Sequence, residues 1–159
     1  MSKTQGRSSK TTRNLACSMV RQAGVRMTRQ RRAVLETILT STDHPTASQI
    51  YERTCRNALG ISLATVYNCL ETMSGAGLIN QLRFDNGPSR YCPNLVPHAH
   101  VLDDESHRVL DVHLKPGVRI EDVFDLPEGV RIHSMDACLR GLIPENCLST
   151  PTSPSTPAS

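Results

Sequence analysis

Apolar residues recur at helical spacing in the first half of the chain, between residues that favour helix ends. The segment 14–23 is expected to form a short first helix, which Gly24 ends. Thr28 is expected to cap a second helix, because an apolar stripe follows it at positions Val34, Leu35, Ile38 and Leu39. The sequence Asp-His-Pro at 43–45 is expected to break this second helix.

Two further helices are indicated by their N-terminal caps. Thr46 and Gln49 have the spacing of a capping box, in which each side chain bonds to the backbone of the other residue. The apolar positions of the helix that they open are Ile50, Cys55 and Leu59. Ser62 is expected to cap a fourth helix that ends at Gly75 and Gly77, with an apolar stripe of Leu63, Val66, Leu70 and Met73.

The hydrophobic period then changes from that of helices to that of strands. Residues 78–84 and 89–92 flank the sequence Asp-Asn-Gly at 85–87, which is a signal for a hairpin turn. Three helices, a helix of the recognition type and a hairpin predict a winged helix-turn-helix domain.

After Pro97 the pattern predicts a small α/β domain. We expect strands at 98–102 and 107–114, a short helix near 119–125 and a strand from 129 to about 140. The fold class is therefore expected to be α+β. The expected organisation is a disordered basic tail at 1–13, a winged-helix domain at 14–93, the small domain at 94–147 and a disordered tail at 148–159.

Charge is divided unequally along the chain. Residues 1–90 contain 13 Lys and Arg against 5 Asp and Glu, whereas residues 91–159 contain 5 against 10. A basic half next to an acidic half favours a polyanionic partner for the basic half. A solvated basic tail explains the charge alone equally well.

Other classes of protein fit the sequence poorly. No run of 18 apolar residues is present, so we expect no membrane span. The first 13 residues lack the apolar stretch of a secretory signal. The six cysteines are scattered and form no CxxC pair, which is typical of reduced thiols. We therefore expect a cytoplasmic protein.

The fourth predicted helix carries groups that suit DNA recognition. Thr65, Tyr67 and Asn68 lie opposite its apolar stripe. In a major groove, threonine can contact a thymine methyl group and asparagine can pair with adenine. Phosphate or minor-groove contacts could come from a basic cluster consisting of Arg26, Arg29, Arg31 and Arg32. The alternative is a helical hairpin whose polar face is merely solvated.

A second group of residues has the chemistry of metal ligands. His98 and His100 alternate on a predicted strand, so both imidazoles fall on one face. Cys92, Asp111 and His44 are competent ligands elsewhere in the sequence. Surface histidines are common, and Cys92 before Pro93 could equally be a packed thiol at the end of a strand or a thiolate ligand of haem.

Several segments together resemble the ferric uptake regulator family, from about residue 20 to 143. They are AGVRMTRQR at 23–31, TASQIY at 46–51, ISLATVY at 61–67 and AGLI at 76–79. The resemblance implies a metal-responsive repressor that binds operator DNA as a homodimer. It also implies that Tyr67 contacts bases and that Arg26 reaches the minor groove. Members usually carry arginine where this chain has Asn68, which changes the expected operator sequence.

The peroxide-sensing branch of the family is similar in the spacing of a regulatory metal site. The resemblance implies that His44, Cys92, His98, His100 and Asp111 bind one divalent ion, with Cys92 at the position of an acidic residue. A thiolate is a softer ligand than a carboxylate, so we expect Zn²⁺ or Fe²⁺ in preference to Mn²⁺. One ion bound by residues of both domains would hold them in one orientation.

A structural zinc site of many family members is expected to be absent here. Its two CxxC pairs are replaced by Asp103 and Ser106 and by Ile143 and Asn146. The homodimer is therefore expected to depend on apolar strand residues, namely Val109, Val112, Leu114, Val130, Ile132 and Leu139.

Three alternatives to a metal-responsive regulator remain from the residues alone. His98, His100 and Asp111 could form the two-histidine, one-carboxylate site of a mononuclear iron enzyme, although a winged helix has no role in such an enzyme. Cys92 could serve a haem or redox sensor on the same scaffold. The chain could also be a metal-independent regulator whose site has decayed. We expect a regulator and no enzymatic activity.

Overall fold

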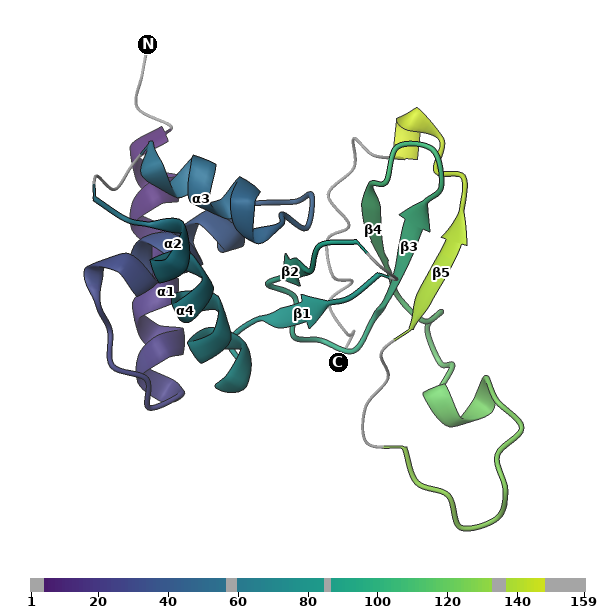
Figure 1. The fold of residues 1–159 in the computed structure, drawn as a ribbon. Coiled ribbons are helices and arrows are strands. Elements are labelled where there is room, and N and C mark those ends of the chain that lie inside the picture. The colour runs from purple at the N-terminus through teal and green to yellow at the C-terminus, as the bar shows by residue number, and fades with distance from the viewer. Residues whose placement is uncertain (1–4, 57–59, 85–86, 133–136, 148–159) are drawn as a thin grey trace. The chain divides into compact units, whose positions relative to one another are not determined.

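The computed structural model describes residues 5–56, 60–84, 87–132 and 137–147 (Figure 1). The chain divides into two compact units, Met1–Leu95 and Val96–Ser159, and each is described by itself. The first unit contains four helices and a two-stranded sheet, and the second contains a three-stranded sheet, counted over the described residues. The predicted α+β class and the winged helix-turn-helix arrangement of the first unit are confirmed.

The elements of the first unit follow the predicted order. They are α1 (Gln5–Gln22), α2 (Arg29–Leu39), α3 (Ala47–Cys55), α4 (Leu63–Gly75), β1 (Asn80–Leu82) and β2 (Arg90–Cys92). None of the described helices has the length and apolar character that crossing a bilayer requires.

The first helix corrects the sequence-based expectation. It begins at Gln5, whereas the pattern placed its start at residue 14 and assigned 1–13 to a disordered tail. That assignment is wrong for residues 5–13. These residues are polar and basic, so they carry no apolar stripe from which a helix could be recognised.

The three predicted helix caps are confirmed. The Thr28 side chain accepts a hydrogen bond from the backbone N–H of Arg31 at 3.1 Å, and Ser62 accepts from Thr65 at 3.1 Å. The Thr46 backbone N–H donates to the side chain of Gln49 at 2.8 Å, and the Gln49 N–H donates to Thr46 Oγ1 at 3.3 Å. The caps satisfy N–H groups that a helix leaves without partners in its first turn. Leu59, an expected apolar position of α3, lies outside the described residues.

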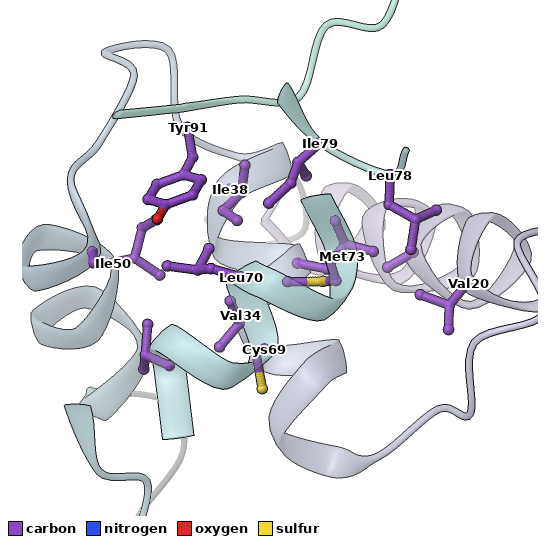
Figure 2. Close-up of a cluster of buried hydrophobic side chains, with 14 of the residues drawn as sticks. Val20, Val34, Ile38, Ile50, Cys69, Leu70, Met73, Leu78, Ile79 and Tyr91 are labelled. Carbon is purple, nitrogen blue, oxygen red and sulfur yellow. The ribbon is translucent and has the colours of Figure 1, made fainter. Parts of the chain in front are cut away.

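The helices of the first unit enclose one aliphatic core (Figure 2). Side chains from all four helices meet in it, including Val20, Val34, Ile38, Ile50, Leu70 and Met73. Burial of each large aliphatic side chain is worth about 1.5–3 kcal/mol. The core therefore fixes the rotation of α4 about its axis, because Val66, Cys69, Leu70 and Met73 are its buried residues.

A two-stranded wing follows α4 and is hydrogen-bonded to the segment before α3. Strand β1 pairs antiparallel with β2, with Asn80 opposite Cys92 and Leu82 opposite Arg90. The Tyr91 N–H donates to the carbonyl of Pro45 at 3.1 Å, next to a bridge between Thr46 and Arg90. The expected turn at 85–87 falls largely outside the described residues, since 85 and 86 are not among them.

The second unit has a sheet of strand order β4-β3-β5. Its elements are β3 (Ala99–Asp103), β4 (Val109–Val112), β5 (Cys138–Gly141) and the 3-10 turns η1 (Ile120–Asp122) and η2 (Glu145–Cys147). Strand β3 pairs antiparallel with β4 and parallel with β5. The expected tail at 148–159 lies outside the described residues.

Two expectations for the second unit are corrected. The helix expected near 119–125 is only the 3-10 turn η1. The strand expected from 129 to about 140 begins only at Cys138, since 129–132 form no strand and 133–136 are outside the described residues. Residues 126–129 are Leu-Pro-Glu-Gly, and proline with glycine disfavours a continuous strand in this region.

Asp103 organises the turn between β3 and β4. Its carboxylate accepts hydrogen bonds from the Ser106 hydroxyl and from the backbone N–H of Glu105 at 3.4 Å. The Ser106 bond is the main reason that the pKa of Asp103 lies below the ordinary value of 3.8, and the backbone N–H of Ile143 adds to the effect. Asp103 therefore links the β3–β4 turn to the segment after β5.

We predict that this carboxylate makes the stability of the second unit dependent on pH. Its pKa is lowered by folding, so its contribution is present above the unfolded pKa of about 3.9 and is lost as pH falls through the folded pKa. Asp103→Asn should lower the melting temperature most near neutral pH, and the difference from wild type should shrink below about pH 4.

The matched control is Asp104→Asn. Asp104 lies beside Asp103 in an exposed ion pair with Arg140 at 3.5 Å, and such pairs contribute little. Thermal melts of the full chain from pH 3 to 7 should separate the two variants. Equal, pH-independent effects of both substitutions would contradict the assignment to Asp103.

Candidate metal centre and nucleic-acid interface

The first unit positions two of the expected metal ligands, His44 and Cys92, which we call the first-unit pair. Their ligand atoms lie within 4.8 Å of one another, and both side chains are buried. The residues are 48 positions apart in the sequence. They meet because β2 is hydrogen-bonded to the segment 44–46, where the Arg90 guanidinium also donates to the carbonyl of His44 at 3.1 Å.

The backbone at His44 is unusual. Its φ of 50° lies in the left-handed region, which non-glycine residues adopt at a cost. The turn is held by its neighbours, because Arg53 of α3 forms a bidentate ion pair with Asp43 at 2.8 and 2.5 Å. This pair also lowers the pKa of Asp43. The structure therefore maintains a strained turn at the position of a candidate ligand.

Cys92 ends β2 with its sulfur close to the backbone of Asn94. The N–H of Asn94 lies 3.4 Å from Cys92 Sγ, in a direction suited to donation. The Cys92 thiol in turn lies 3.9 Å from the carbonyl of Asn94, to which it can donate. Because the side chain is fully buried, these contacts fit a packed cysteine as well as they fit a metal ligand.

The second unit brings together the three other expected ligands, His98, His100 and Asp111, which we call the second-unit triad. The Nε2 atoms of the two histidines are 2.9 Å apart, and each lies 3.4 Å from Asp111 Oδ1. The histidine side chains are 3% and 4% exposed, and that of Asp111 is 16% exposed. Strand register explains the meeting, because His100 is paired with Asp111 across β3 and β4.

The triad has the donor set and spacing of a transition-metal site. Two nitrogens bound to one ion at about 2.0–2.1 Å are about 2.9–3.4 Å apart, depending on the geometry. The observed 2.9 Å falls at the short end of that range. His98 Nδ1 lies 2.6 Å from the carbonyl of Val96, to which it can only donate, so the lone pair of the neutral ring is on Nε2. The residues therefore fit a divalent ion.

The sequence reasoning missed His113. Its ring centre lies 5.8 Å from that of His98. The sequence did contain a pattern that could have identified it, because Asp111 and His113 are spaced two residues apart, as are His98 and His100.

The candidate DNA contacts lie on exposed parts of the first unit. Tyr67 is 50% exposed, and Asn68 and Arg26 are also exposed. Thr65 is half-buried, and its hydroxyl is 2.8 Å from that of the cap residue Ser62. Because α4 buries its apolar face, Tyr67 and Asn68 project from the opposite side.

Solved structures of known proteins share the fold. A zinc-bound manganese uptake regulator is 27% identical, with a TM-score of 0.58 over 79% of this chain and 96% of that one. The ferric uptake regulator from Pseudomonas aeruginosa with manganese is 22% identical, with a TM-score of 0.64 over 80% and 97% of the two chains.

Sequence comparisons find relatives of the same kind. A peroxide-responsive repressor, PerR, of Staphylococcus aureus is 36% identical over 92 residues. The aligned segment spans 58% of this chain but only 62% of the length of that relative. The sequence model described as the ferric uptake regulator family matches residues 22–137, which is well over half of the chain. The protein therefore belongs to the ferric uptake regulator family.

Proposed function

We propose that the protein is a metal-dependent, DNA-binding transcriptional repressor of genes for metal homeostasis or oxidative stress. The observation that carries the proposal is the convergence of His98, His100 and Asp111 in a chain whose helix α4 exposes Tyr67 and Asn68. Membership of the family and similarity to a peroxide-responsive repressor support the same function.

One ion bound by both ligand sets is the proposed regulatory element. The first-unit pair supplies a nitrogen and a sulfur donor, which is too few for the four ligands of a stable zinc site. The second-unit triad supplies two nitrogens and an oxygen. An ion that binds all five residues stabilises one relative orientation of the units, and so shifts the population towards the conformation that binds DNA.

The donor chemistry favours Zn²⁺ or Fe²⁺. Three of the five donors are imidazoles and one is a thiolate, and both types prefer these ions to Mn²⁺. Cys92 is thus the residue that distinguishes this site from one made of nitrogen and oxygen donors alone.

The proposed operator complex contains a homodimer. In the second unit, Leu139 of β5 is 55% exposed, and Leu114 and Val130 are 38% and 48% exposed. Among the described strands β5 pairs only with β3, so its other edge remains available to a second copy. Two copies present two α4 helices to a DNA site with two half-sites.

Metal-dependent DNA binding is the first test. A DNA fragment selected in vitro with the Zn²⁺-loaded protein should bind tightly in fluorescence anisotropy, and excess chelator should abolish binding. Tyr67→Ala should cost about 1–3 kcal/mol, and Arg26→Ala should reduce the salt slope by about 1.

Two residues of the second unit provide matched controls for these variants. Phe124→Ala removes an aromatic ring that is 51% exposed, and Arg119→Ala removes an exposed guanidinium. Both should leave operator affinity unchanged. Affinity that is independent of metal, or equal losses in test and control variants, would refute the proposal. A Soret band in protein purified from cells would favour the haem sensor instead.

The role of Cys92 gives the second test. Metal binding should release a proton and protect Cys92 from alkylation, because the ion binds the thiolate. Cys92→Ser should lower Zn²⁺ affinity more than Mn²⁺ affinity, and Cys92→Asp should shift preference towards Fe²⁺ or Mn²⁺. Competition titrations with a chromophoric chelator measure both effects.

Cys69 is the internal control for alkylation. It is buried in α4, where desolvation raises the pKa of its thiol, and metal should not change its rate of alkylation. Equal alkylation of Cys92 with and without metal, together with unchanged Zn²⁺ affinity in Cys92→Ser, would exclude it as a ligand.

The dimer is tested by its dependence on metal and on Leu139. Sedimentation velocity should show a dimer that survives chelation, because the CxxC pairs of a structural zinc site are absent from the sequence. Leu139→Lys should shift the equilibrium to monomers, whereas Leu95→Lys, at a leucine 47% exposed in the first unit, should not. Dissociation and unfolding upon chelation would instead reveal a structural metal site.

A further inference from the structure

His98 and His113 lie just beyond the end of the ladder that pairs His100 with Asp111. In this ladder His100 is opposite Asp111, and the last pair is Ala99 opposite Val112; His98 and His113 are the residues next to that last pair. Extended by one residue beyond β3 and β4, the alternation of side chains puts all four ligand-type residues on one face of the sheet. The ring centres of His98 and His113 are 5.8 Å apart, which agrees with that placement.

The separations of the histidine rings fit a common ion. An imidazole bound at about 2.0–2.1 Å has its ring centre about 3.2 Å from the ion, so two such rings have centres at most about 6.4 Å apart. The ring of His98 is 4.4 Å from that of His100 and 5.8 Å from that of His113. Both distances are within the limit.

We propose that His113 is a further metal ligand, and that His98, His100, Asp111 and His113 form a complete four-donor site within the second unit. Three imidazoles and one carboxylate suit divalent transition ions such as Zn²⁺ or Co²⁺, and they suit Ca²⁺ and Mg²⁺ poorly because those ions prefer oxygen ligands. Four donors are the number that a tetrahedral site requires.

This proposal deepens the proposed function, since it concerns the same regulatory ion. It implies that the second unit can bind the ion without His44 and Cys92. His113 is exposed, whereas the side chains of His98 and His100 are nearly inaccessible, so His113 is the donor that an ion from solvent meets first. The second unit can then hold the ion before the first-unit pair binds it.

The test uses full-length protein in which both first-unit ligands are removed, His44→Ala with Cys92→Ser. Co²⁺ is the probe, because its visible absorption reports coordination directly. This background variant should bind one Co²⁺ per chain. Adding His113→Gln should weaken binding at least about tenfold, since even residues that only orient a ligand have effects of 10–100-fold. The matched control is His107→Gln, at an exposed histidine on the β3–β4 turn.

A second measurement on the wild-type chain does not depend on substitution. Long-range proton–nitrogen correlation spectra with Zn²⁺ should show an imidazole nitrogen of His113 at the chemical shift of a metal-bound nitrogen. Equal Co²⁺ affinities of the His113→Gln and His107→Gln variants, no Co²⁺ binding by the background variant, or an unshifted His113 would each overturn the proposal. Loss of metal-dependent DNA binding alone would count against the proposed function and not against this site.

Discussion

The hydrogen bonds between strand β2 and residues 44–46 are the constraint on which the first unit's chemistry depends. The N–H of Tyr91 donates to Pro45, and the Arg90 side chain donates to the carbonyl of His44. These bonds fix the turn before α3 against the end of the wing. Because they do, an imidazole and a thiol that are 48 residues apart in the sequence come within reach of one ion. Without them, His44 would be an isolated histidine on a loop.

Strand register plays the equivalent role in the second unit. A shift of one residue between β3 and β4 would turn Asp111 and His113 to the opposite face from His98 and His100. The observed register pairs His100 with Asp111, and while His98 Nδ1 contacts the carbonyl of Val96, its Nε2 lies 2.9 Å from that of His100. Backbone pairing thus brings the possible donor atoms of His100 and Asp111 together.

The chain belongs to the ferric uptake regulator family, and helix α4 presents an exposed face in its first unit. The same core that buries Val66, Leu70 and Met73 leaves Tyr67 exposed, so the exposed face of α4 follows from how the helix packs. Asn68 and Cys92 are the positions at which the chain departs from the residues usual in the family. Under the proposed function they are the positions that bear on its operator sequence and its choice of metal.

The sequence by itself determined the local features. The caps at Thr28, Thr46 and Ser62 and the order of elements were predicted, because caps and hydrophobic period depend on residues close in the chain. The part of α1 before residue 14 was not predicted, because it is polar and has no apolar stripe. The start of β5 at Cys138 was not predicted either, because this strand pairs in parallel with β3, which is distant in the sequence. Only the tertiary structure decided that the ring of His113 lies 5.8 Å from that of His98, because this proximity depends on the pairing of two segments, which spacing along one strand does not contain.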